Sequence, residues 1–229
     1  MDTASTKISE IIKFLILFLV TFFLSCSSEE QNSEEVAGAE PPPMIYEYRS
    51  EINEISEKDV LHYCCDKQTK DLVSLLSVKV SYINIEGKTA IGELIVNKEI
   101  AEEVVDIFRD IYECRFPIVK ITPIDFYDCN DDKSMEDNNT SCFNYRTVTG
   151  SKKLSDHSSG RAIDINPVFN PFVKRREVVP INGAKYIDRE IQEPGMIQKN
   201  DCVVNAFKSR GWQWGGDWKH EQDYQHFYK

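Results

Sequence analysis

The most informative stretch of the chain reads SDHSSGRAIDIN, residues 155–166, and a second stretch, DYQHF, follows at residues 223–227. Together they supply two imidazoles and two carboxylates: His157, His226, Asp164 and Asp223. Two histidines and one aspartate are a workable set of three protein ligands for a catalytic zinc ion, which leaves a fourth position for water. A second carboxylate beside that water could act as its base. If the two stretches converge in space, the sequence predicts a hydrolytic metal centre.

The local pattern around Asp164 favours a metal ligand. His157 and Asp164 are separated by a Ser-Ser-Gly turn, and Gly160 allows the backbone to bend where a side chain would obstruct it. Asp164 alternates with Ile163 and Ile165, so it faces away from them, and a carboxylate in an apolar strand needs a cation or hydrogen bonds. A bland alternative is that His157 and Asp164 only pair with each other and hold a loop. The presence of His226 favours the metal.

Two further charged residues have candidate roles beside the metal. Asp223 precedes His226 by three residues, which predicts a general base near the ligand; the alternative is a surface carboxylate that caps a turn. Arg146 lies on a short predicted strand and could stabilise an oxyanion, because a guanidinium is always charged. Its alternative role is an ion pair with Asp131 or Asp132 of the acidic loop.

Three tryptophans stand close together in the segment GWQWGGDW, residues 211–218. They could form the wall of a groove, and Trp214 is our candidate for a substrate contact. Aromatic residues so close in sequence are equally often part of a core, and the sequence leaves both interpretations open.

Composition restricts the class of protein. The chain has 229 residues, of which 41% are hydrophobic and 28% are charged, which predicts one folded domain with an N-terminal extension. The net charge is −11 and no basic stripe runs through the sequence, so we expect no nucleic-acid partner. We expect a monomer.

The N-terminus predicts export. Residues 1–25 contain an apolar run, 14–24, which is short for a membrane span of roughly 20 residues and suits a signal peptide. Ser25-Cys26 after such a run resembles the lipobox of bacterial lipoproteins, in which the cysteine carries lipid. The alternative is an uncleaved membrane anchor. Residues 26–43 predict an acidic disordered tether. Either interpretation places the domain in the cell envelope, outside the cytoplasm, with Cys26 as the expected lipid anchor.

The cysteines fit that compartment. Seven are present, and six remain when Cys26 is set aside: Cys64, Cys65, Cys114, Cys129, Cys142 and Cys202. An even number outside the cytoplasm permits disulfides. Cys129 and Cys142 flank a polar loop and could close it, whereas the overall connectivity stays open.

Hydrophobic periodicity predicts a mixed domain. We expect an N-terminal helical region over 44–77 and then a domain over 78–229, beginning with a hairpin of strands and a helix capped by Asn97. The predicted elements are strands 78–85 and 90–96, helix 98–113, strand 118–126, loop 128–141, strands 143–148 and 160–165, an irregular stretch 180–194, helix 197–209 and a terminal strand at DYQHF. This order predicts an α+β fold with a small antiparallel sheet flanked by helices.

Taken together, the segments from about residue 78 to His226 resemble the M15 family of zinc peptidases. The resemblance rests on GELIV (92–96), FPI (116–118), NNTS (138–141), FNYR (143–146) with VTG (148–150), SDHSSGRAIDINPVFNPFV (155–173), GMI (195–197), GWQWGGDW (211–218) and DYQHF. That family comprises D-alanyl-D-alanine carboxypeptidases and L-alanyl-D-glutamate endopeptidases, which share a fold with the hedgehog signalling domain. The family often has an acidic residue after the final His-Phe, where this chain has Tyr228.

The resemblance implies a set of roles. It implies zinc held by His157, Asp164 and His226, with Asp223 as base and Arg146 as the residue that stabilises the carbonyl oxygen. Ser155 matches a position that supports the site by hydrogen bonding, and we place it with Trp214 on the substrate side.

The expected activity is therefore hydrolysis of peptide bonds in peptidoglycan stem peptides that contain D-amino acids. One alternative is a non-catalytic module in which zinc is structural and the groove binds cell-wall peptide or a protein. Another is a lipoprotein adaptor without metal.

Overall fold

The computed structural model describes residues 47–56, 74–148 and 150–229, which belong to one compact unit, Ile45–Lys229. The predicted signal peptide and tether, residues 1–43, lie outside the described residues. In the part of the chain that is described, no helix has both the length and the apolar character that crossing a membrane requires.

A long antiparallel hairpin forms the scaffold of the unit. Strand β2 (Leu75–Ile83) pairs along its whole length with β3 (Thr89–Asn97), and β1 (Ser50–Glu54) pairs with the other edge of β2. Alternate residues of the hairpin point to one face and are buried there, as the period of two requires. These residues are Val78, Val80, Tyr82, Leu94 and Val96. The predicted hairpin is confirmed.

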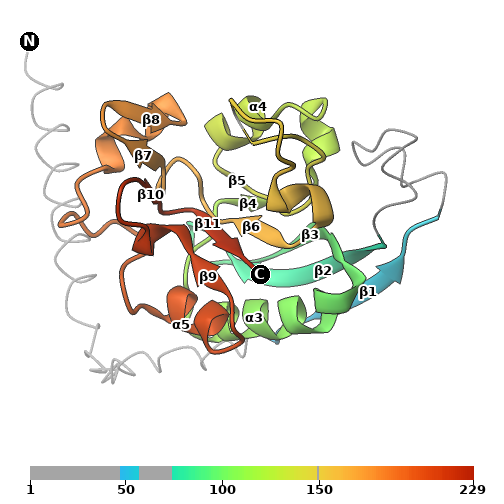
Figure 1. The fold of residues 1–229 in the computed structure, drawn as a ribbon. Coiled ribbons are helices and arrows are strands. Elements are labelled where there is room, and N and C mark those ends of the chain that lie inside the picture. The colour runs from blue at the N-terminus through green and yellow to red at the C-terminus, as the bar shows by residue number, and fades with distance from the viewer. Residues whose placement is uncertain (1–46, 57–73, 149) are drawn as a thin grey trace, which may run out of the picture. The chain divides into compact units, whose positions relative to one another are not determined.

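Helix α3 (Ala101–Glu113) packs on the buried face of this hairpin, and Figure 1 shows it lying along β2. It follows the short helix η2 (Lys98–Ile100), whose first turn is capped by the Asn97 side chain accepting a hydrogen bond from the Glu99 backbone N–H. The predicted cap and helix are therefore confirmed. The buried stripe of α3 consists of Val104, Val105, Ile107, Phe108 and Ile111. Burying each such side chain stabilises the fold by about 1.5–3 kcal/mol.

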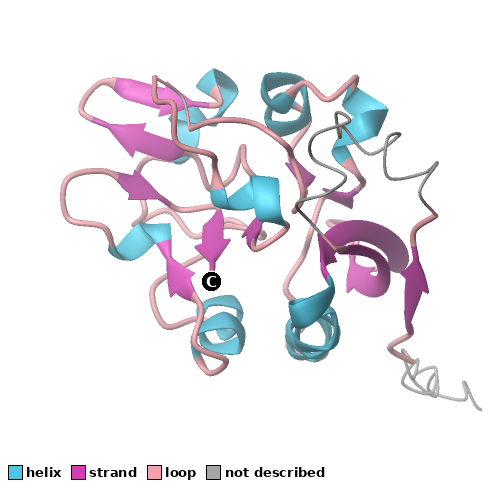
Figure 2. Cartoon of the chain, turned by 45° about the vertical axis from the view of Figure 1, so that its right-hand side comes forward, coloured by secondary structure: helices cyan, strands magenta, loops and turns pink. Residues whose placement is uncertain are grey.

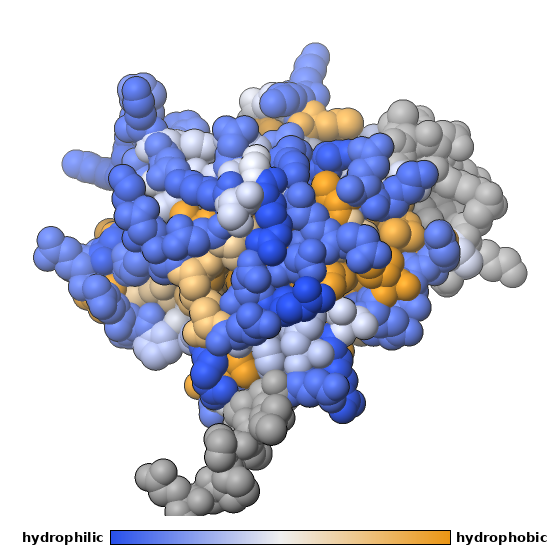
Figure 3. Space-filling model, turned by 90° about the horizontal axis from the view of Figure 1, so that it is seen from below, coloured by the Kyte–Doolittle hydropathy of each residue, from blue (hydrophilic) through white to orange (hydrophobic). Residues whose placement is uncertain are grey.

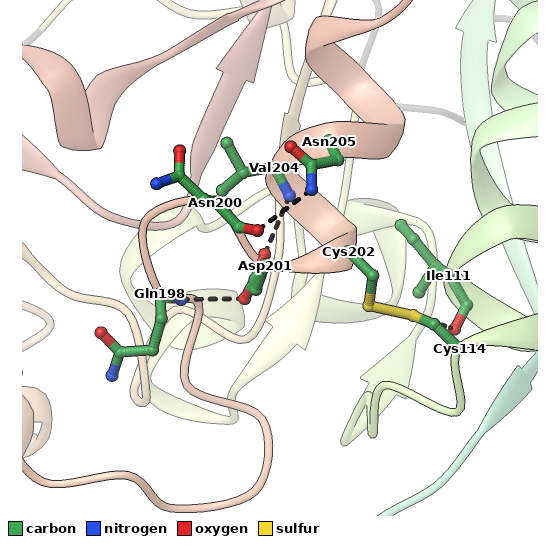
Figure 4. The surroundings of a disulfide bond; sticks show 8 residues. All are labelled: Ile111, Cys114, Gln198, Asn200, Asp201, Cys202, Val204 and Asn205. Carbon is green, nitrogen blue, oxygen red and sulfur yellow. Dashed lines mark hydrogen bonds between the residues drawn. A yellow bond between two sulfur atoms is a disulfide. The ribbon is translucent and has the colours of Figure 1, made fainter.

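Helix α5 (Cys202–Lys208) lies beside α3 and is linked to it covalently. A disulfide joins Cys114, directly after α3, to Cys202, the first residue of α5 (Figure 4). The Asp201 carboxylate caps α5 by accepting hydrogen bonds from the backbone N–H groups of Val204 and Gln198. Phe207 of α5 then stacks on Phe227, with ring centroids 4.0 Å apart, so α5 supports the terminal strand.

The remaining strands are short and form three small sheets. In the order β6-β11-β9, antiparallel strands β6 (Ala162–Asp164), β11 (His226–Tyr228) and β9 (Gln213–Trp214) form what we call the ligand sheet. A second antiparallel sheet contains β10 (Gln222–Asp223), β7 (Phe172–Lys174) and β8 (Glu177–Val179), and β4 (Lys120–Ile121) pairs in parallel with β5 (Asn139–Thr140).

Short helices connect these strands, as the cyan coils of Figure 2 show. They are η3 (Ile124–Tyr127), α4 (Asp131–Glu136), η4 (Asp156–Ser159), η5 (Ile181–Tyr186) and η6 (Gly215–Asp217). The fold is thus a mixed α+β arrangement, as predicted, but its strands form several small sheets rather than one. The face seen from below is mostly hydrophilic, with apolar atoms in small separate areas (Figure 3), in keeping with the net charge of −11.

Several predicted elements are wrong. The helical pattern of 44–77 fails where the structure describes it, because β1 and the start of β2 are strands; the rest of that prediction lies outside the described residues. An exposed strand at the edge of β2 gains its hydrogen bonds from a neighbour distant in sequence, which periodicity does not register. Helix α5 is shorter than the predicted 197–209.

The region 118–148 differs most from its prediction. The strand expected over 118–126 is limited to β4, since Pro123 lacks an N–H and precedes η3. The polar stretch 128–141 contains α4, capped by the Asn130 side chain, which accepts a hydrogen bond from the Lys133 backbone N–H. Residues 143–148 form no strand. The proposed Cys129–Cys142 bridge is also wrong: Cys142 is a buried free thiol, and Cys129 is disulfide-bonded elsewhere.

Candidate metal centre

The structure brings the three predicted ligands together. His157 comes from η4, Asp164 ends β6, and His226 begins β11 directly opposite Asp164 in the antiparallel register. His226 Nδ1 lies 2.9 Å from Asp164 Oδ1, and His157 Nε2 lies 3.1 Å from Asp164 Oδ2. The two imidazole nitrogens, His157 Nε2 and His226 Nδ1, are 3.3 Å apart. Segments separated by more than fifty residues therefore converge on one point.

This donor set fits a zinc ion. The three ligand atoms all lie within 4.8 Å of one another and all three residues are buried. Tetrahedral zinc with bonds near 2.0–2.1 Å places neighbouring ligand atoms about 3.3 Å apart, which is close to the observed spacing. His157 Nδ1 lies 2.5 Å from the Cys142 carbonyl oxygen and donates to it, so the lone pair of Nε2 points at the other two ligands.

Charge and burial oppose each other at this centre. Burial acts to raise the pKa of Asp164, but the charges and hydrogen bonds of His157 and His226 outweigh it and hold that pKa far below its usual range. Burial acts to lower the pKa of His226, yet the hydrogen bond with Asp164 and its charge raise the pKa overall. The Asp164 carboxylate and the His226 imidazole thus stabilise one another's charged forms. The contact of Asp164 with His157 matches the alternative of simple pairing and also the needs of a cation site.

The turn that carries His157 is fixed by its two ends. Ser155 caps η4: its Oγ accepts a hydrogen bond from the His157 backbone N–H at 3.3 Å. Gly160 ends the turn with φ of 69°, and a Cβ there would come within 2.7 Å of the Asn97 nitrogen. The Gly160 carbonyl instead accepts a hydrogen bond from that nitrogen at 3.0 Å. Ser155 therefore supports a ligand, and glycine is required for the turn to meet β3.

Asp223 has an unusual environment. It lies on β10, and although the residue is partly exposed, its Oδ1 atom is buried with no hydrogen-bond partner among the described residues. Burial raises its pKa to about 7; the His226 imidazole opposes the rise, and the Asp164 charge adds to it. The Gln225 side chain also hydrogen-bonds to it. A Cβ on Gly215 would lie 2.8 Å from the Asp223 Cβ, so glycine permits this close approach.

Arg146 makes the ion pair that was its alternative role. Its Nη2 lies 2.9 Å from Asp131 Oδ2, and both side chains are about a quarter exposed, at 29% and 25%. Arg146 Nε is buried and makes no hydrogen bond within the described part of the chain. An ion pair at Nη2 and an unpaired donor at Nε are compatible with both roles.

Trp214 is buried among other side chains. It is 4% exposed, its Nε1 donates to the Tyr224 carbonyl oxygen at 2.9 Å, and its ring stacks on Phe227. This burial favours the core interpretation of Trp214 over a substrate contact. The aromatic residues beside the ligands are Trp218 and Tyr228, whose ring centroids lie 5.9 and 5.3 Å from that of His226.

Sequence reasoning also missed two asparagines behind the ligands. Asn166 is fully buried; its side chain accepts from the Val119 N–H and donates to the carbonyls of Pro117 and Gly195. Asn170, also fully buried, donates to three carbonyls and accepts from the Ile197 N–H and the Arg189 guanidinium. The two Asn-Pro pairs at 166–167 and 170–171 are the only signal of these residues in the sequence, and such pairs ordinarily indicate turns.

The structure also contains a cavity of about 650 Å³ away from these residues. Its lining includes Lys79, Ile91, Lys120, Ile121 and Phe126, and none of the predicted site residues is part of it. Volume alone therefore does not identify the site, and we base the assignment on the chemistry of the ligand cluster.

Comparison with known proteins agrees with this assignment. Residues 149–229 match a family model described as D-alanyl-D-alanine carboxypeptidase, and the matched segment contains all three ligands and Asp223. No curated protein and no solved structure gives a match. The match supports a peptidase and agrees with the resemblance noted in the sequence. The match over residues 149–229, which is about a third of the chain, supports an M15 family peptidase.

Proposed function

We propose that the protein is a zinc-dependent peptidase that hydrolyses peptide bonds in peptidoglycan stem peptides containing D-amino acids. The observation that carries the proposal is the convergence of two imidazoles and a carboxylate, with donor atoms 2.9–3.3 Å apart. The family match supports the peptidase class, and the buried Asp223 Oδ1, which has no hydrogen-bond partner among the described residues, supports catalysis rather than a purely structural metal.

Each residue then has a defined task. His157, Asp164 and His226 would hold zinc, which when bound lowers the pKa of a coordinated water towards about 7 and polarises a carbonyl. Asp223 accepts the proton of the attacking water and passes it to the leaving amine. In the metal-free protein, burial raises the pKa of this carboxyl, and a bound zinc ion would lower it again. Arg146 stabilises the negative charge that develops on the carbonyl oxygen.

The same proposal includes the setting of the enzyme. The unit would have the hedgehog/DD-peptidase fold and act as a monomer. Its signal peptide would be removed, Cys26 would carry lipid, and residues 26–43 would act as a tether within the cell envelope. This location would place the domain near peptidoglycan.

Zinc content and product analysis test the proposal. Purified full-length protein should contain one zinc per chain by elemental analysis, and defined muropeptides incubated with it should give cleaved products by mass spectrometry. His226→Ala should lose both zinc and hydrolysis. Asp223→Ala should keep zinc while kcat falls about 10²–10⁴-fold, the usual contribution of a general base. His220→Ala, at an exposed histidine away from the ligands, is the matched control.

The alternatives predict different results. Equal turnover by Asp223→Ala would reject the base assignment. A zinc-loaded protein that binds muropeptides without cleaving them would be a binding module. A protein that takes up no zinc, even when zinc is added, would be an adaptor.

A further inference from the structure

The carboxylate of Asp131 connects two side chains of one segment. Its Oδ1 accepts a hydrogen bond from Asn144 Nδ2 at 2.9 Å, and its Oδ2 pairs with Arg146 Nη2 at 2.9 Å. We propose that Asp131 is a positioning residue that holds the Arg146 guanidinium in its working orientation. This inference rests on the proposed function, in which Arg146 stabilises the oxyanion.

The carboxylate is itself well fixed. Asp131 is the first residue of α4, directly after the Asn130 cap. Exposed ion pairs contribute little because solvent screens them and two long side chains lose freedom. This pair differs, since both partners are about three-quarters buried and the second carboxylate oxygen is anchored by Asn144, a residue 4% exposed. The carboxylate therefore presents a defined acceptor to the arginine.

Asn144 and Arg146, whose side chains contact Asp131, are also hydrogen-bonded to the turn that carries His157. The Arg146 N–H donates to Ser158 Oγ at 3.0 Å, and the Ser158 hydroxyl donates to the Arg146 carbonyl at 2.6 Å. The Asn144 N–H donates to the His157 carbonyl at 3.2 Å. Backbone contacts thus place residues 144–146 against the turn that carries a ligand, and Asp131 fixes the side chains of the same residues.

The guanidinium keeps a donor available. Asp131 pairs with Nη2, whereas Nε is buried and has no acceptor within the described residues. A buried unpaired donor is costly unless a partner arrives, and an oxygen of the substrate would be such a partner. Asp131 therefore engages Nη2 of the guanidinium and leaves the Nε donor for an oxygen of the substrate.

Loss of this anchor should affect turnover more than binding. A misplacement of about 1 Å in a catalytic group can reduce the rate about 10²-fold. The charge that Arg146 stabilises develops only in the transition state, so substrate binding should change little. We expect Asp131→Ala and Asp131→Asn to lower kcat by about 10²-fold, with little change in KM or zinc content. Asp132→Asn, at the exposed neighbour on the same turn, should match the wild type.

A double-mutant cycle provides the decisive test. If Asp131 acts through Arg146, then Asp131→Ala should cost no further activity in an Arg146→Ala background. An equal fractional loss in both backgrounds, or wild-type kcat in Asp131→Ala, would overturn the inference while the peptidase proposal stands.

Binding of an inhibitor separates this inference from the proposed function. A phosphinate analogue of a D-alanyl dipeptide mimics the tetrahedral anion, and its affinity can be measured by calorimetry on zinc-loaded protein. Arg146→Ala and Asp131→Ala should weaken its binding to the same extent. A wild type that neither cleaves muropeptides nor binds the analogue would reject both proposals; one that binds it equally in all variants would reject the inference alone.

Discussion

The scaffold of β1–β3 and α3 and the ligand sheet of β6, β11 and β9 are built by different means. The paired strands of the scaffold hairpin have nine residues each, whereas those of the ligand sheet have two or three. The scaffold is held by apolar burial, with Val78, Val80 and Leu94 almost completely removed from solvent. The strands of the ligand sheet pair with one another at only a few positions.

Polar side chains supply hydrogen bonds to backbone groups that the short strands do not pair. The side chains of Asn166 and Asn170 bond to backbone groups of three separate segments, 117–119, 165–166 and 195–197, and Arg189 joins this network through Asn170. A buried hydrogen-bond network fixes irregular backbone precisely, and each lost partner leaves an unsatisfied group. Regular secondary structure thus supports the domain, whereas irregular backbone held by buried asparagines positions the metal ligands.

Breaking the covalent link between the scaffold and α5, the helix that supports β11, should have the largest effect on stability. The Cys114–Cys202 disulfide spans 88 residues, and closing such a loop removes about 4–5 kcal/mol of denatured-state entropy. Replacing both cysteines by serine should lower the free energy of unfolding by about 2–5 kcal/mol, measured by urea denaturation. Zinc affinity of the folded protein should not change, and a large loss of affinity would show that the link shapes the site.

Truncating one buried side chain in the scaffold and one near the ligand sheet should affect stability similarly but zinc binding differently. Leu94→Ala removes buried apolar volume from the scaffold and should cost about 2–5 kcal/mol. Asn170→Ala leaves at least two buried groups unsatisfied and should cost about 2–4 kcal/mol. Only Asn170→Ala should also weaken zinc binding, measured by competition with a chelator. Equal zinc affinity in both variants would contradict the distinction between the regions.

A smaller effect should appear in the pH dependence of the metal-free protein. The depressed pKa of Asp164 stabilises the fold above about pH 4, and this contribution is lost as the pH falls further. The raised pKa of His226 stabilises it below about pH 6.5, and that contribution is lost at higher pH. Asp223, with its pKa raised to about 7, favours the protonated folded state, so stability declines between about pH 4 and 7.

The pKa shifts of Asp164, His226 and Asp223 are all consistent with higher stability near pH 5 than at pH 8. The melting temperature of chelator-treated protein should be higher near pH 5 than at pH 8, and Asp223→Asn should flatten the decline. Exposed titratable groups of the scaffold should contribute little to this pH dependence of stability. A melting temperature that rises from pH 5 to pH 8 would contradict the assignment of these groups.

Sequence predicted the parts of the molecule that depend on local pattern. The hairpin, the Asn97 cap and α3 follow from alternation, capping and helical spacing, and the ligand cluster follows from the chemical types in residues 155–166 and 223–227. Trp214 shows the limit, because aromatic spacing does not distinguish a groove wall from a core. Strand β1 and the Asn166 network depend on partners distant in sequence, which periodicity cannot identify.

The hydrogen bond that orients His157 ends on a main-chain oxygen, that of Cys142. The thiol of Cys142 plays no part in that bond, and it points instead to the Gly160 carbonyl. Exchange of this cysteine for another small residue should therefore leave the imidazole tautomer as it is. The ring orientation is encoded in the path of the chain rather than in the identity of one amino acid.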